Sequence, residues 1–313
     1  DEAVDSTGKI VRDILTIGVP IAFGACIMAI LNSIDSKLCM NRLQSAAGFS
    51  YYEAKVLYGV YGKAQTLFNL PAAFITPLTI AIVPEISGAI ARREHASAAK
   101  TAEDSMRISA LISLPMGVGL TVLAYPIMQV LYPNSNAAGP GLLRIMGAAS
   151  FFVCIVLMEN AILQASGREK LTMVTMISGG VVKIVINWFL VARPEINIYG
   201  APVGTLVSYM AMAALNYAFM CRTLDDRPRL AKVFARPLAA SVLMGLTAWA
   251  IYGLCARFIG AADWLGTAVC MMIAVIAAVV VYAVSAVCLR AIVREDLELI
   301  PGGDRIGRVL HLR

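Results

Sequence analysis

Charge and catalytic side chains are scarce in this sequence. Charged residues make up 15% of the 313 residues, whereas a soluble domain usually carries about 25%. Histidine occurs only twice, and the seven cysteines follow no metal-ligand or disulfide-framework spacing. No nucleophile stands near a base in a catalytic pattern. We therefore expect no enzymatic activity, no catalytic residue, no metal site and no cofactor.

Hydrophobic residues take the place of the missing charge. They make up 59% of the chain, and the mean hydropathy is +0.76. Apolar windows of about 20 residues, long enough to cross roughly 30 Å of hydrocarbon as helix, predict an all-α, multi-pass membrane bundle. No segment alternates with the period of a membrane β-strand. The eight predicted spans are 14–34, 57–88, 108–131, 142–165, 171–191, 200–221, 237–256 and 265–289.

Most of the 26 Lys and Arg lie in alternate connections. These connections are 91–107, 167–170, 221–236 and the tail after Leu289. Because positively charged loops are retained in the cytoplasm, we expect a cell-membrane protein with both termini cytoplasmic. The positive charge is spread over separate loops, which fits contact with membrane lipids better than with nucleic acid.

Polar side chains inside the predicted spans are the candidate substrate contacts. An ionisable group at bilayer depth costs roughly 2.5 to 3.5 kcal/mol on insertion scales, so it normally faces a polar cavity or a partner helix. The candidates are Lys63, Lys183, Asn187, Glu159, Asp35 and Asn32.

The two lysines each have a second interpretation. Lys63 lies near the outer end of its span, where its ammonium could simply reach the headgroups. Lys183 lies too deep for that, and Asn187 is one turn away on the same face. This stripe predicts either a substrate contact or a hydrogen-bonded lock between helices.

The acidic candidates are equally open. Asn32 and Asp35 share a helix face. The slightly favoured interpretation of Asp35 is an interfacial residue that pairs with Lys37 or Arg42. Glu159 is adjacent to Asn160, so at most one of the two is expected to face a cavity squarely, and Glu159 is the better candidate to pair with a lysine or bind a proton.

Prolines predict bends in the helices. Pro71, Pro77 and Pro84 fall in one span, and Pro115 falls in the next. Each removes an intrahelical hydrogen bond and clashes with the preceding turn. We expect these four positions to act as hinges, although static kinks for packing would have the same sequence.

Several stretches together resemble a known family. They are "LNSIDSKLCMNRL", "LYGVYGKAQTLFNLPAAFITPLTIAIVPEIS", "AILQASGREK" and "VVKIVINWFLV" followed by "INIYGAPVGTLVSY". They resemble the stage V sporulation protein B branch of the polysaccharide and lipid-linked oligosaccharide flippases, within the multidrug/oligosaccharidyl-lipid/polysaccharide exporter superfamily. The resemblance runs over nearly the whole chain.

The resemblance implies a division of the chain. Family members have two six-helix lobes followed by a terminal helix pair. By this likeness, 1–13 is a cytoplasmic lead, 14–221 the second lobe, 222–289 the terminal pair and 290–313 a cytoplasmic tail. The polar start at Asp1 has no signal-peptide pattern. We expect the chain to begin inside something longer, with an N-terminal lobe of the same protein as its missing partner.

The resemblance also implies a function. It predicts a flippase that exports a lipid-linked saccharide, such as an undecaprenyl-diphosphate peptidoglycan precursor, by alternating access in a cell-envelope or sporulation setting. Lys63 would lie on a cavity-lining helix and contact the diphosphate, although this span has one lysine and no arginine where the lipid II flippases are arginine-rich. The alternatives are a drug/cation antiporter of the same superfamily, with Asp35 and Glu159 as acidic sites, and a fragment that is inactive alone.

Overall fold

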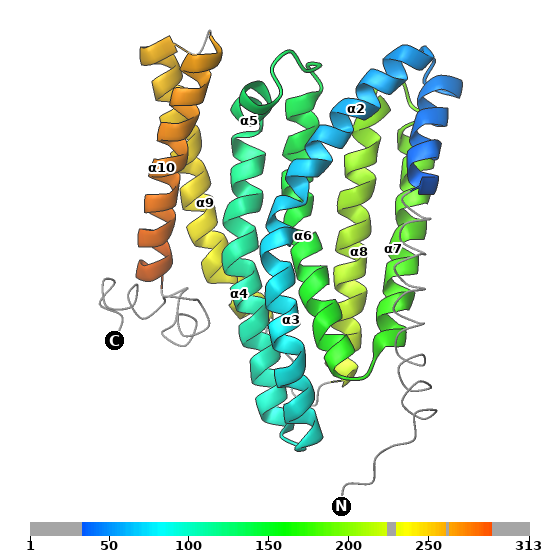
Figure 1. The fold of residues 1–313 in the computed structure, drawn as a ribbon, viewed down its shortest axis with the longest axis vertical. Coiled ribbons are helices and arrows are strands. Elements are labelled where there is room, and N and C mark those ends of the chain that lie inside the picture. The colour runs from blue at the N-terminus through cyan, green and yellow to red at the C-terminus, as the bar shows by residue number, and fades with distance from the viewer. Residues whose placement is uncertain (1–32, 224–229, 261–262, 290–313) are drawn as a thin grey trace, which may run out of the picture.

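The computed structural model describes residues 33–223, 230–260 and 263–289, and throughout these ranges the regular structure is helical (Figure 1). Seven of its spans are long and apolar enough to cross a membrane. The all-α membrane bundle is therefore confirmed, while the predicted span 14–34 lies almost entirely outside the described residues. The first described residues, 33–45, are helical, and we call this segment the 33–45 helix. The elements that follow are α2 (Tyr51–Phe68), α3 (Leu70–Ala91), α4 (His95–Val122), α5 (Ala124–Leu131), α6 (Gly139–Ala165), α7 (Glu169–Leu190), η1 (Asn197–Tyr199), α8 (Gly200–Thr223), α9 (Leu230–Cys255), η2 (Ala256–Gly260) and α10 (Trp264–Cys288).

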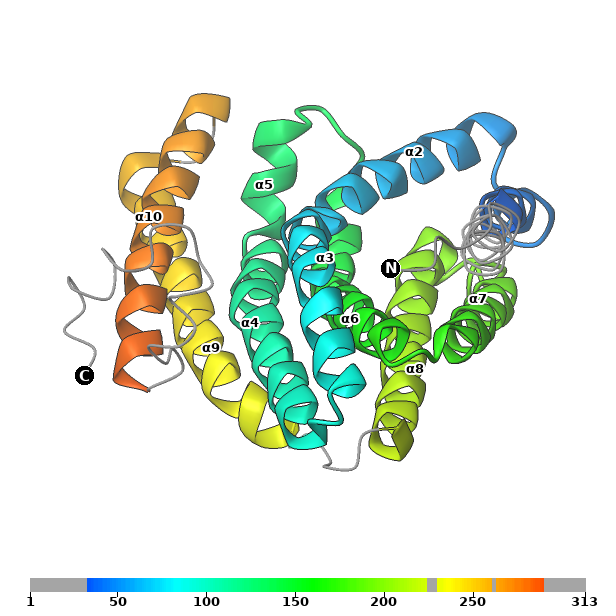
Figure 2. The same cartoon turned by 60° about the horizontal axis from the view of Figure 1, so that its bottom comes forward.

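The predicted span 57–88 is two helices that meet at Asn69. Ser50 starts α2 with a capping box, in which its hydroxyl accepts from the Glu53 backbone N–H and the Glu53 carboxylate accepts from the Ser50 N–H. Pro71 lies in the first turn of α3, where its missing N–H has no intrahelical partner to lose. Figures 1 and 2 show α2 turning away from the line of α3 at this junction.

The other three prolines that were predicted as hinges lie inside continuous helices. Pro77 and Pro84 are interior residues of α3, and Pro115 is an interior residue of α4. Pro115 has no N–H, so the carbonyl of Leu111, four residues earlier, lacks its usual intrahelical donor. The hydroxyl of Tyr282 on α10 donates to that carbonyl at 2.6 Å. A neighbouring helix therefore restores the backbone hydrogen bond, as a membrane-embedded proline requires. The hinge roles stay predictions.

The helix α6 forms the centre of the bundle and packs against α3, α4 and α8 (Figure 2). Its buried residues occur on all of its sides, as expected for an apolar helix enclosed by others. The α9–α10 pair stands beside α4 and α5, at the side of the molecule opposite α7. This pair shares a small core with Leu123, which includes Met244, Ala248, Ala274 and Ala278.

Candidate functional site

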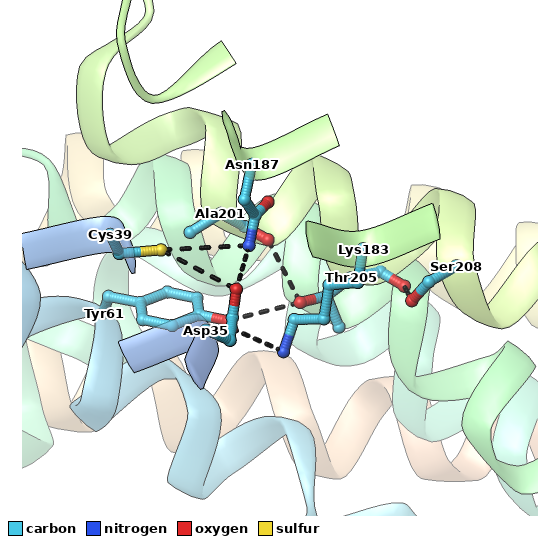
Figure 3. A network of polar contacts seen from close by, with 8 residues as sticks. All are labelled: Asp35, Cys39, Tyr61, Lys183, Asn187, Ala201, Thr205 and Ser208. Atoms are coloured by element: carbon cyan, nitrogen blue, oxygen red, sulfur yellow. Dashed lines mark hydrogen bonds and ion pairs between the residues drawn. The ribbon is translucent and has the colours of Figure 1, made fainter. Parts of the chain in front are cut away.

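Asp35 and Lys183 form a buried ion pair between the 33–45 helix and α7 (Figure 3). The Lys183 Nζ lies 2.9 Å from Oδ2 of Asp35, and the two side chains are 14% and 6% exposed. Asn187, one turn after Lys183, donates its Nδ2 to Oδ1 of Asp35. The prediction that Asp35 pairs with Lys37 or Arg42 is therefore wrong, because the helix turns Asp35 toward α7.

The same face of the 33–45 helix continues this contact. Cys39 lies one turn after Asp35, with its Sγ 3.9 Å from Oδ1 of Asp35 and 3.8 Å from Nδ2 of Asn187. Arg42 follows at helical spacing, and its guanidinium carbon lies 3.3 Å from the ring centroid of Trp188. Positions i, i+4 and i+7 of a helix share one face, which explains how these three residues together reach α7.

Two further helices close the site. On α2, the buried Tyr61 hydroxyl is 3.2 Å from Oγ1 of Thr205 on α8. Thr205 also donates to the carbonyl of Ala201 at 3.0 Å. We call Asp35, Cys39, Tyr61, Lys183, Asn187 and Thr205 the Asp35–Lys183 network.

A glycine on α8 makes room for this network. A Cβ at Gly204 would overlap Oδ1 of Asn187. Gly200 is similarly close to Leu190 and Val191 at the end of α7. Small residues at spacing four let two membrane helices approach closely. Gly204 therefore allows Asn187 to lie between α7 and α8 and reach Asp35.

The Asp35–Lys183 network balances one negative and one positive charge. Lys183 is neutralised by Asp35, to which the Asn187 amide also donates. Of the two interpretations of the Lys183–Asn187 stripe, this geometry matches the hydrogen-bonded lock between helices. The network joins the 33–45 helix to α2, α7 and α8.

Lys63 lies apart from this network. It is half-buried on α2, and its Nζ is 5.2 Å from the ring centroid of Tyr132, which follows α5. Tyr61, only two residues earlier, faces Thr205 instead. The structure therefore does not bring the two candidate lysines together. The sixth candidate, Asn32, lies outside the described residues.

Glu159 belongs to a second buried cluster, between α6 and α8. Glu159 and its neighbour Asn160 are 1% and 8% exposed. The Nδ2 of Asn216 donates to Oδ1 of Asn160 at 3.0 Å, and Asn216 also hydrogen-bonds to Glu159. Both adjacent side chains thus meet one amide on α8. The sequence contains the signal for Asn216, since an amide inside an apolar span normally faces a partner helix. Tyr61 and Thr205 gave no such signal.

A groove of about 450 Å³ opens between α4, α6 and α9. Its lining is mostly apolar and includes Val118, Leu246 and Trp249. Arg144, near the start of α6, adds a positive charge to this apolar surface. This groove could not be predicted from the sequence, because its lining comes from three helices that are separate in the chain.

Comparisons with known proteins match most of the chain to one family model. Residues 56–274 match the family model described as Lipid II flippase MurJ. The uncharacterized membrane protein YabM of Bacillus subtilis (strain 168) is 25% identical over 316 residues, which cover 100% of this chain and 58% of that protein. Stage V sporulation protein B of the same organism is 27% identical over 84% of this chain and 49% of that protein. The Lipid II flippase MurJ of Bacillus subtilis (strain 168) is 22% identical over 90% of this chain and 51% of that protein.

A solved structure of MATE in the bent conformation shares the fold. Its TM-score is 0.51 at 18% identity, over 91% of this chain and 67% of that chain. The chain spans about half the length of the curated relatives that it matches.

Proposed function

The chain belongs to the lipid II flippase MurJ family, and from this we propose that it forms part of a flippase that moves a lipid-linked saccharide across the cell membrane by alternating access. The observation that carries the proposal is the family match over residues 56–274, which covers the bundle from α2 to α10. The undecaprenyl-diphosphate class of cargo follows from the same kinship. We propose a transporter and no catalytic role.

We also propose that a second lobe completes the transport pathway. The support is the length of the relatives, of which this chain spans about half. In the proposed division, 14–221 acts as one lobe and 222–289 as the terminal pair. Both termini lie in the cytoplasm in this proposal, since the positively charged connections are on that side.

Lys63 is the proposed contact for the diphosphate. Lys183 is already neutralised by Asp35 at 2.9 Å, whereas Lys63 lies over the neutral ring of Tyr132. An ammonium without an acidic partner attracts a diphosphate more strongly than one in an ion pair. We assign Lys183 and Asn187 the task of holding α7 in place beside the 33–45 helix.

The groove beside Arg144 supports a lipid-linked cargo. Its apolar lining suits a prenyl tail, and Arg144 provides a charge at its edge. The antiporter alternative has less support, because the Asp35–Lys183 ion pair also involves one of its acidic sites. Asp35, one of its two acidic sites, is occupied by the lysine.

The test is a flipping assay in proteoliposomes with the full-length natural protein and a fluorescent prenyl-diphosphate saccharide. A charge-assisted hydrogen bond is worth about 1.5 to 3 kcal/mol, so Lys63→Gln should lower the initial rate about tenfold or more. Lys55→Gln changes an exposed lysine on the same helix and should leave the rate unchanged. Equal rates for the two variants would remove Lys63 from the pathway. Transport of organic cations with no transport of the prenyl diphosphate would overturn the proposed function.

A further inference from the structure

The carboxyl group of Glu159 is enclosed between α6 and α8 with too few hydrogen-bond donors around it. Glu159 Oε2 and Asn216 Oδ1 are both buried and have no donor, although the two side chains are hydrogen-bonded to each other. From this shortage we propose that Glu159 is a proton-binding site and holds its proton in the conformation described here. The proposal goes beyond the flippase function and does not depend on it.

The donor count supports a proton. The amide of Asn216 supplies two N–H groups, and its contacts are Oδ1 of Asn160 and the Glu159 carboxyl. Two buried oxygens then remain as acceptors only. A protonated carboxyl adds one O–H donor to this cluster, whereas a carboxylate adds none. A single proton therefore removes the mismatch between donors and acceptors.

No basic side chain of the described residues replaces that proton. The influences on the Glu159 carboxyl are its burial and its hydrogen bond to Asn216, with no charged group among them. Several charged groups on the helices packed against α6 have partners of their own. Asp104 and Arg107 of α4 pair with each other at 3.1 Å, and Glu85 of α3 accepts from Thr101 at 3.5 Å. Lys63 of α2, Lys183 of α7 and Tyr209 of α8 are in contact with Tyr132, Asp35 and Phe68, respectively.

A metal ion fits the cluster less well than a proton. Hard cations such as Mg²⁺ and Ca²⁺ require six or more oxygen ligands. The cluster offers two acceptors without a donor. The described residues also contain no group of three or more His, Cys, Asp or Glu that could hold a metal ion.

The site couples protonation to helix packing. A neutral carboxyl is tolerated between α6 and α8, but an ionised one without a counter-charge strongly favours water. Opening the contact between these helices would admit water and release the proton. Closing it would take a proton up again. Such a site makes the balance between two conformations depend on pH.

Infrared spectroscopy of the full-length protein in lipid tests this directly. A carboxylic-acid C=O band reports a protonated acid, and its response to each substitution assigns the band to a residue. We expect such a band in the natural protein and its loss in Glu159→Gln. Glu85→Gln removes an exposed carboxyl from α3 and should leave the band intact.

The proposal would be overturned by no such band in the natural protein, an unchanged band in Glu159→Gln, loss of the band in Glu85→Gln, or loss of the band on adding sodium chloride at fixed pH. The last would assign the site to a cation. Should Glu159→Gln fail to fold, Asn216→Ala provides the second variant. This substitution removes Asn216 Oδ1, the acceptor that the proton on Glu159 would satisfy, so it must shift the carboxylic-acid band. An unshifted band would refute the assignment. These measurements need no transported substrate, so they stand or fall separately from the flipping assay.

Discussion

Replacing Lys183 by methionine should destabilise the protein far more than removing a surface charge. The 2.9 Å ion pair with Asp35 is enclosed, with the two side chains only 14% and 6% exposed. At an effective dielectric constant of about 20, two charges at that distance attract by about 6 kcal/mol. Desolvation of the two ions takes back several kcal/mol of this.

Removing one partner leaves the other charge buried and unpaired. Such truncations cost about 3 to 5 kcal/mol. We expect a loss in this range for Lys183→Met and for Asp35→Leu separately. The double variant leaves no charge behind, so its loss should be smaller than that of either single variant. The coupling free energy between the two positions should then exceed about 3 kcal/mol, the lower end of the loss expected for one single variant.

The measurement is reversible unfolding in mixed micelles of a denaturing and a mild detergent, followed by far-ultraviolet circular dichroism. The matched control is Arg92→Gln, which breaks the 3.2 Å ion pair between Arg92 and Glu94. These two side chains are 63% and 50% exposed. Exposed pairs are worth at most about 1 kcal/mol. If Lys183→Met costs no more than the control, or if the double variant loses the sum of the two single losses, the network is not the lock that we describe.

Two smaller changes test the packing in the same unfolding assay. Tyr282→Phe deprives the Leu111 carbonyl of its donor and should cost about 1 to 2 kcal/mol; an unchanged stability would show that the carbonyl finds another partner. Gly204→Ala places a methyl group against Asn187 and should lower the free energy of unfolding by about 1 to 3 kcal/mol. The control, Gly59→Ala, has open space around its Cβ and should leave that free energy unchanged. Equal stabilities of the two variants would refute the close α7–α8 contact.

The helices could be predicted from the sequence because their signal is local. Long apolar runs and their polar ends placed α6, α7, α8 and α10 within a few residues of their observed bounds. The break at Asn69 was predicted only as a bend, because proline weakens a helix without saying where the chain turns. The separation of α5 from α4 at Leu123 was not predicted.

The polar contacts between helices could be predicted only in part. The shared face of Lys183 and Asn187 follows from helical spacing, and burial of Glu159 follows from its apolar surroundings. Which residue pairs with which depends on how distant segments pack. Local spacing therefore favoured Lys37 or Arg42 as the partner of Asp35, and only the packed bundle identifies Lys183.

The contact between Tyr282 and the Leu111 carbonyl limits how the last two helices can travel. Sliding α10 along α4 by one helical turn, about 5.4 Å, would separate the Tyr282 hydroxyl from the Leu111 carbonyl and leave that carbonyl without a donor at membrane depth. Swivelling about this point preserves the contact. The hydrogen bond therefore permits rotation of the α9–α10 pair about α4 and opposes its translation along α4.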